Sequence, residues 1–326
     1  MEIVSGVSSW KLTIRREAAG ITLLRGVTCD EQAVLPETLF GLPVTALGDH
    51  ALSPSAGKTE GEQVLVTCGR PPEEAAWDNR RLRSLALPPR LGRVGEYAFF
   101  NCGALKTLEL YDGIGFWGGG ALMNCRSLDT VRLTRISEEQ GISLAYFADE
   151  LSRELDVTVT ETDGTAARLI FPEFLEVYEE NCPAHHFDYT ICGAGYPYHH
   201  CFRQKKLSWK EYDQLWSGYL GMEHDEDTAL RLCWWRLRCP KGLTDRAAAG
   251  YTAYLRDNAV RAAEWLVERG DPEGLAFLLR QTDVEQAALS ALCETARQRG
   301  GTEVQAVLLE ECHRRFPVRG DARFEL

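Results

Sequence analysis

The sequence contains no apolar stretch that approaches the roughly 20 consecutive residues needed to span a bilayer. Its first residues, MEIVSGVSSWKLTIRREAAG, also lack the basic start and continuous apolar run of a secretory signal peptide. Basic residues are fewer than acidic ones: the sequence has 36 Lys and Arg residues and 48 Asp and Glu residues, which gives a formal net charge of −12. A non-specific grip on nucleic acid or on an anionic membrane is therefore not expected. We predict a cytoplasmic protein that has neither nucleic acid nor a membrane as partner.

Paired cysteine motifs such as C-x-x-C are also absent, although the 326 residues include 11 cysteines. The cysteines are odd in number and many sit singly within apolar or helical patterns, as in RLCWW and SALCET. This distribution does not indicate a disulfide framework. Reduced thiols that pack as small hydrophobes are predicted instead, which fits a reducing compartment.

One stretch matches a dinucleotide-binding motif. Gly113, Gly115 and Gly118 spell G-x-G-x-x-G after the strand-like TLEL. A second stretch, SAGKTEG, imitates the end of a phosphate loop, but Leu52 stands where that loop needs its first glycine. Motifs this short need a structural context, and a sequence repeat would explain the glycines equally well.

The repeat is present. Residues 82–104 and 105–127 align at a constant offset of 23 residues, with the leucines of an L-x-x-L-x-L pattern in the same columns, and LDTVRL opens a third copy. The last two glycines of the dinucleotide motif align with Gly92 and Gly95, whereas Arg90 replaces the first. We interpret these glycines as turn residues of coils that bury their leucines against one another, and we expect no cofactor.

The repeated units resemble the leucine-rich repeats of the BspA-like family over approximately residues 10–135. The similarity rests on four dipeptides, Leu87-Pro88, Val94-Gly95, Ala98-Phe99 and Asn101-Cys102. Residues 20–52 look like the longer opening unit of that family. The resemblance implies a short leucine-rich-repeat β-solenoid over residues 1–160. Small, polar and Pro-rich ends indicate a loop insertion at about 53–80, around a short strand QVLVTC. It also implies a bacterial protein-binding protein, since such repeats are often found on bacterial surfaces.

Residues 161–206 form an aromatic connector that is rich in His and Cys. It supplies soft and borderline ligands for a tetrahedral zinc site, although their spacing matches no common zinc finger. The candidate ligands are Cys182, His185, Cys192, His199 and Cys201. Packing between domains is the preferred interpretation of these residues, and no catalytic residue is assigned, because no oxyanion-stabilising turn can be placed.

Residues 207–326 are dense in helix formers with apolar residues at intervals of three and four. Two segments near the C-terminus align at an offset of 30, with Arg269-Gly270 on Arg299-Gly300 and Leu278-Leu279 on Leu308-Leu309. A helix, a glycine turn and a second helix are loosely similar to ankyrin repeats, although the TPLH opening is absent. The expected fold class is therefore α+β, with the β-solenoid followed by an all-α domain of helical hairpins.

Both repeat types offer extended surfaces, and neither brings a chemical motif. We therefore predict a non-catalytic protein-interaction scaffold that is not an enzyme. The predicted partner-binding residues face outward between the leucines: Arg83, Ala86, Lys106, Glu109, Asp129 and Arg132. The alternative is a zinc-dependent module or enzyme centred on residues 182–201. The sequence determines neither the identity of the partner nor the oligomeric state.

Overall fold

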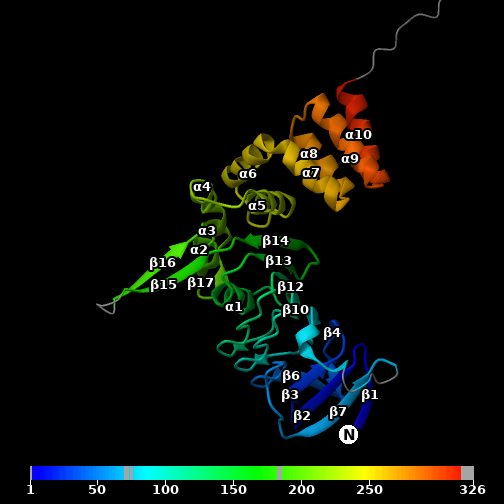
Figure 1. Cartoon of the computed structure of the whole chain (residues 1–326), viewed down its shortest axis with the longest axis vertical. Helices are drawn as coiled ribbons and strands as arrows, with labels where there is room; N and C mark the ends of the chain where they lie inside the picture. The colour runs from blue at the N-terminus through cyan, green and yellow to red at the C-terminus, as the bar shows by residue number, and fades with distance from the viewer. Residues whose placement is uncertain (1, 70–72, 74–75, 182–185, 317–326) are drawn as a thin grey trace, which may run out of the picture. The chain divides into compact units, whose positions relative to one another are not determined.

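The computed structural model describes residues 2–69, 73, 76–181 and 186–316, and its fold class is α+β (Figure 1). The chain divides into two compact units. The first contains residues 1–225 and 239–243, and the second contains residues 226–238 and 244–326. Residues 161–206, the predicted connector, and residues 207–225 belong to the first unit.

The first unit contains two large sheets. In spatial order, one has β1 (Glu2–Ser5), β7 (Glu62–Thr67), β2 (Trp10–Glu17), β3 (Gly20–Thr28), β6 (Leu42–Leu47), β9 (Arg93–Val94) and β11 (Phe116–Trp117), with β5 (Thr38–Leu39) paired to β6. The other has β14 (Ala166–Phe171), β13 (Leu155–Thr160), β12 (Thr130–Thr134), β10 (Thr107–Tyr111), β8 (Ser84–Ala86) and β4 (Gln32–Val34). Successive coils of the chain contribute one short strand to each sheet, as β8 and β9 do.

The register predicted from the 23-residue offset is confirmed. Strands β8, β10 and β12 run parallel, with Leu85 paired to Leu108 and Leu108 paired to Val131. All three side chains are fully buried. Because side chains alternate along a strand, every second residue of these strands lies on the opposite face of the sheet. The face that carries these apolar side chains lies in the core, and burial contributes about 1.5–3 kcal/mol for each large side chain.

Two kinds of residue make the coils fit together. Asn101 and Asn124 adopt left-handed conformations, with φ of 64° and 62°, and the Asn124 amide donates a hydrogen bond of 2.8 Å to the Asn101 side-chain oxygen. Gly118 has another role, because a Cβ atom there would lie 2.4 Å from the backbone nitrogen of Glu96. The chain reversal predicted for Gly118 is therefore carried out by the asparagines, and the glycine allows neighbouring backbones to touch.

The insertion predicted at about 53–80 includes the short strand that its QVLVTC segment predicts, and it is not only a surface loop. It contains β7, which pairs with β1 and β2, and the 3-10 helix η2 (Asn79–Arg81). Val64 and Val66 of β7 are buried. The buried Asn79 side chain donates hydrogen bonds to the carbonyls of Gly26 and Leu52. The insertion therefore completes the core at the N-terminal end of the coils.

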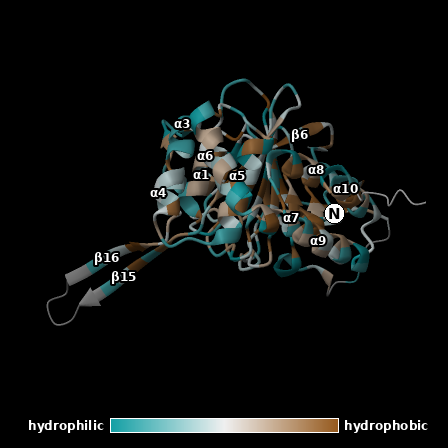
Figure 2. Cartoon of the chain, turned by 90° about the horizontal axis from the view of Figure 1, so that it is seen from above, coloured by the Kyte–Doolittle hydropathy of each residue, from teal (hydrophilic) through white to brown (hydrophobic). Residues whose placement is uncertain are grey.

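At the other end of the coils, helix α1 (Ser143–Glu150) follows β12. The connector then forms a hairpin of β15 (Leu175–Asn181) and β16 (His186–Cys192), helix α2 (Tyr196–His199), and a short hairpin of β17 (Phe202–Arg203) and β18 (Lys206–Leu207). The β15–β16 hairpin extends away from the rest of this unit (Figure 2). Helices α3 (Trp209–Gln214) and α4 (Trp216–Leu220) complete the unit. The Tyr212 hydroxyl donates to the Ile170 carbonyl, which joins α3 to β14.

The second unit contains helices joined by short turns: α5 (Glu226–Arg238), α6 (Asp245–Asp257), α7 (Ala259–Arg269), α8 (Pro272–Gln281), α9 (Gln286–Gln298) and α10 (Thr302–Arg315). Gly270 and Gly300 end α7 and α9 with φ of 64° and 73°, at the equivalent positions that the offset of 30 predicts. The repeat is imperfect, because Leu279 is buried whereas Leu309 is 44% exposed. Trp234 is buried in this unit.

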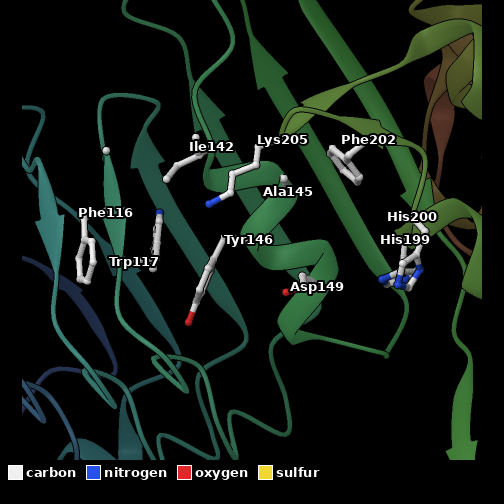
Figure 3. A pocket seen from close by; sticks show the side chains of 11 residues that line it. Phe116, Trp117, Ile142, Ala145, Tyr146, Asp149, His199, His200, Phe202 and Lys205 are labelled. Atoms are coloured by element: carbon white, nitrogen blue, oxygen red, sulfur yellow. The ribbon is translucent and has the colours of Figure 1, made fainter.

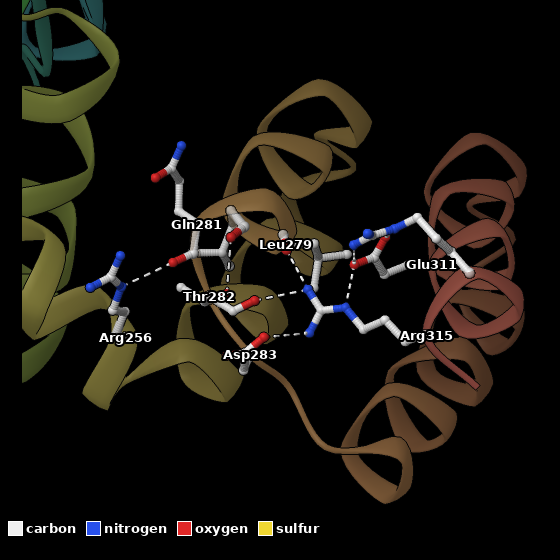
Figure 4. Close-up of polar contacts among 9 residues, drawn as sticks. Arg256, Leu279, Gln281, Thr282, Asp283, Glu311 and Arg315 are labelled. Atoms are coloured by element: carbon white, nitrogen blue, oxygen red, sulfur yellow. Dashed lines mark hydrogen bonds and ion pairs between the residues drawn. The ribbon is translucent and has the colours of Figure 1, made fainter.

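Arg315 connects the two helix pairs of the repeat. Its guanidinium donates to the carbonyls of Leu279 and Thr282 at the end of α8 and forms an ion pair with Glu311 (Figure 4). A cation at these carbonyls satisfies acceptors that the end of a helix leaves unpaired. This contact fixes α10 against α8.

Candidate functional site

The outward faces of β8, β10 and β12 form an open surface, which we call the strand face. Ser84, Thr107 and Thr130 are aligned in one row across the three strands. The next row contains Ala86, Glu109 and Arg132. Parallel sheets are usually covered on both faces, yet these side chains are half-exposed or exposed.

The structure gathers the six predicted partner-binding residues into two rows on this side of the sheet. Ala86, Glu109 and Arg132 lie within strands, in register. The other three, which the sequence placed on the strands, lie immediately before them. Their backbones are aligned nonetheless, since the Lys106 N–H donates to Arg83 O at 2.7 Å and the Asp129 N–H donates to Lys106 O at 3.2 Å.

Charges on the strand face pair with one another across neighbouring strands. Arg132 lies 2.5 Å from Glu109, and Lys106 lies 3.5 Å from Asp129. Arg83 pairs with Glu31 at 3.2 Å, a partner that the sequence analysis did not name. The cationic side chains are 60–70% exposed. Exposed pairs of this kind contribute only about 0–1 kcal/mol, so their charges remain accessible to another molecule.

A buried charge column, which the sequence analysis missed, lies just beyond the ends of these strands. Asp112, Arg135 and Glu161 follow the last residues of β10, β12 and β13. Arg135 lies 3.5 Å from Asp112 and 3.1 Å from Glu161. The side chains of Arg135 and Asp112 are each 3% exposed, and that of Glu161 is 13% exposed. The repeat contained the signal, because the offset of 23 places Asp112 beneath Arg135.

Burial raises the pKa of Asp112, against the opposing effects of the Gly141 N–H and of Arg135. The Gly141 N–H donates to the Asp112 carboxylate at 2.7 Å. At the far end of the column, Lys241 forms an ion pair with Glu161 at 2.5 Å. The column is structural, because its charges face one another and are not presented to solvent.

Two of the predicted zinc ligands, Cys182 and His185, lie outside the described residues. Of the others, Cys192 is exposed, whereas Cys201 is buried and its thiol donates to Tyr198 O at 2.9 Å. Burial raises the pKa of the Cys201 thiol to about 12. Within the described ranges, the structure shows no group of three or more His, Cys, Asp or Glu side chains that could hold a metal ion. The zinc site remains a prediction.

His199 joins the connector to the rest of the first unit. Its ring nitrogens lie 2.9 Å from Ala148 O and 3.0 Å from Pro172 O, and the side chain is buried. A backbone carbonyl only accepts hydrogen bonds. A neutral imidazole has a single N–H and therefore donates to one of these two carbonyls. Burial nevertheless dominates and lowers the pKa of His199.

This lowered pKa makes a prediction about acid stability. The folded protein holds His199 neutral, and the unfolded chain takes up a proton near the ordinary value of about 6.5. Stability is therefore present above that pH and is lost as the pH falls through the lower folded value. We expect the melting temperature to fall between pH 7.5 and pH 5.5, and to fall less in His199→Gln, measured by circular dichroism. The exposed His200→Gln is the control. A His199→Gln variant with the wild-type pH dependence would contradict this assignment.

A cavity of about 410 Å³ lies within the first unit, between α1, β11 and the turn that joins β17 to β18 (Figure 3). Trp117, Tyr146 and Lys205 are among the residues that line it. The sequence analysis did not find it. The one signal was Trp117, which stands in the column where the preceding coil has Val94.

The geometry defines an α+β protein with a leucine-patterned stack of parallel strands and a unit of antiparallel helices. No protein-family model matches the sequence, and no curated protein matches it. A search of solved structures found a leucine-rich-repeat protein of T. pallidum, at 16% identity and a TM-score of 0.24, which covers 37% of this chain and 68% of that one. It also found a leucine-rich cell-surface protein of Faecalibacterium prausnitzii, at 18% identity and a TM-score of 0.26, which covers 45% of this chain and 36% of that one.

Among the described helices, none is both long enough and apolar enough to cross a bilayer.

Proposed function

We propose that this protein is a non-catalytic interaction scaffold that binds a protein partner through the strand face. The observation that carries the proposal is a parallel sheet with an exposed outer face that displays charges of both signs, aligned from strand to strand. Surfaces of this kind bind by electrostatic complementarity, which sets specificity and the rate of encounter. The six residues from Arg83 to Arg132 named above are the proposed contacts.

The finer architecture belongs to the same proposal. We place residues 1–160 in a BspA-like leucine-rich-repeat solenoid, supported by the 23-residue offset and by one strand per coil in each sheet. The helices of the second unit, with their 30-residue offset, are proposed as stacked hairpins of ankyrin-like appearance. A cytoplasmic location and the absence of nucleic acid as a partner remain predictions from composition.

Exchanging one ion pair tests the strand face without changing net charge. The double variant Glu109→Arg with Arg132→Glu reverses the local pattern while allowing the pair to re-form. Because like charges placed across an interface cost several kcal/mol, we expect capture of the partner to fall by about tenfold or more. Immobilised wild-type and exchanged proteins are compared by quantitative mass spectrometry of the captured proteins.

Thermal unfolding is the control for this experiment, because an exposed pair contributes less than about 1 kcal/mol and the melting temperature is expected to be unchanged. Equal capture of the same proteins by both forms would exclude the Glu109–Arg132 row as the contact. A wild-type protein that captures nothing specific would remove the proposed function itself.

A further inference from the structure

The cavity in the first unit exists because the coil stack changes its construction there. Strand β11 is the last strand of its sheet, paired only with β9 on the path β6-β9-β11. In the next coil, helix α1 follows β12 where the preceding coil has a strand. A helix and a strand edge do not interlock as two paired strands do. Here α1 contacts β11 through Trp117, and a space of about 410 Å³ remains beside this contact. This volume lies within the range of about 300–1,000 Å³ that is typical of small-molecule sites.

One wall of the cavity is an aromatic pair whose polar atoms are already engaged. The rings of Trp117 and Tyr146 are stacked, with centroids 4.9 Å apart and planes 17° from parallel. The Trp117 Nε1–H donates to Ser143 Oγ at 3.2 Å, and the Tyr146 hydroxyl donates to Gly118 O at 2.8 Å. These bonds fix both rings from the protein side, so that what the pair offers to a ligand is flat apolar surface. Such a surface favours another planar ring.

The opposite wall carries a positive charge on a fixed turn. Gln204 and Lys205, which join β17 to β18, have φ of 49° and 63°, a left-handed conformation that costs a non-glycine residue roughly 1–2 kcal/mol. The turn is held on both sides, since Arg203 pairs with Glu211 and the Leu207 N–H donates to Gln140 Oε1 at 2.8 Å. Two-residue hairpin loops require this conformation at both central residues, so the hairpin itself sets the position of Lys205.

Lys205 is directed toward the aromatic pair. Its side chain extends from the turn toward Trp117 and Tyr146 in Figure 3. Within the described part of the chain, no ion pair to its ammonium group is recorded, although the protein as a whole has a net charge of −12. Asp149, on α1, also lines the cavity, so the site offers one cation and one anion beside the aromatic wall.

We propose that this cavity binds a small planar aromatic molecule that carries one negative charge, such as an aromatic carboxylate. The ring lies against Trp117 and Tyr146, and the anionic group pairs with the Lys205 ammonium. Asp149 disfavours a second negative charge, which restricts the class to monoanions. This site is separate from the strand face and does not depend on the proposed protein binding.

Three naphthalene probes of similar size and different charge test the proposal: 2-naphthoate, neutral 2-naphthylmethanol and cationic 2-naphthylmethylammonium. Isothermal titration calorimetry on the full chain is expected to give affinity for the carboxylate at least about tenfold above that for the alcohol. Lys205→Gln is expected to reduce the carboxylate affinity to the level of the alcohol and to leave the alcohol unchanged. Lys206→Gln, the neighbouring lysine on β18, is the matched control and is expected to keep the wild-type order.

A second variant tests the aromatic wall. Trp117→Val installs the residue that the preceding coil has at the equivalent position, Val94, and it is therefore expected to fold. It is expected to weaken binding of carboxylate and alcohol by about the same factor, because the ring contact is shared. Tighter binding of the ammonium probe than of the carboxylate would overturn the proposal, since Asp149 would then dominate the site. Carboxylate binding that neither Lys205→Gln nor Trp117→Val changes, or no carboxylate binding at all, would also overturn it.

Discussion

Replacing Arg135 with methionine is expected to lower the free energy of unfolding of the first unit by about 3–5 kcal/mol. Within the described residues Arg135 is the cation that lies between Asp112 and Glu161, and its removal leaves the buried Asp112 carboxylate without a compensating charge and Glu161 with Lys241 alone. Urea denaturation at pH 7.5, followed by tryptophan fluorescence, measures the loss. Methionine has a similar volume, so the change reports mainly the charge.

The size of this effect is expected to depend on pH. Burial already raises the pKa of Asp112 in the wild-type protein, and loss of Arg135 raises it further. A carboxyl group whose folded pKa is raised favours folding at low pH, and this contribution is lost as the pH rises through the folded value. The penalty of Arg135→Met is therefore expected to be smaller at pH 5 than at pH 7.5. The double variant with Asp112→Asn is expected to recover part of the loss at pH 7.5.

Arg132→Met is the matched control, because Arg132 lies three residues before Arg135, on β12, and pairs with Glu109 on the exposed side. We expect a loss of less than about 1 kcal/mol for this variant. Equal losses in the two methionine variants would contradict a special role for the buried column.

Gly118→Ala is expected to destabilise the first unit by about 3 kcal/mol, at the upper end of the usual cost of overpacking. The added Cβ would lie 2.4 Å from Glu96 N and 2.5 Å from the carbonyl carbon of Gly95. Both atoms belong to the backbone of the preceding coil, so no side-chain rotation relieves the contact, and neighbouring coils must separate. Chemical denaturation measures the loss, and hydrogen exchange of β9 and β11 should show where the coils separate.

Gly115→Ala supplies the comparison within the same glycine motif. A Cβ at Gly115 would have Gly92 O as its nearest neighbour, at 3.9 Å, which is ordinary contact. We expect a change of no more than about 1 kcal/mol in either direction. If both alanine variants lost the same stability, close approach of the coils would not be the reason for Gly118.

The repeat could be predicted from the sequence because its physical cause is periodic. A strand buries every second residue, and a coil of fixed length places those residues over one another, so that Leu85, Leu108 and Val131 had to share a column. Local signals also sufficed for Gly270 and Gly300, where a left-handed end of a helix favours glycine. The Ser208 cap of α3 is a further local signal, since its hydroxyl accepts from the Glu211 N–H.

The site was less predictable. Arg135 was missed although the offset aligned it with Asp112, because charged residues at the end of an apolar pattern ordinarily face solvent. The cavity depends on Trp117 and Lys205, which lie in different elements and meet only after the connector folds back against α1. Likewise, β7 is a short apolar segment in an insertion, and its partners β1 and β2 come from the start of the chain.

By itself, the sequence determined the spacing of the coils, the leucine columns, the α+β class and the glycine turns of the helical unit, because each depends on residues close in sequence or related by a constant offset. Only the tertiary structure decided which charges are buried, where the first unit ends and that a cavity lies beside α1 and β11. Those features depend on contacts between segments distant in the chain, and their energies come from burial and from the pairing of groups that no local pattern brings together.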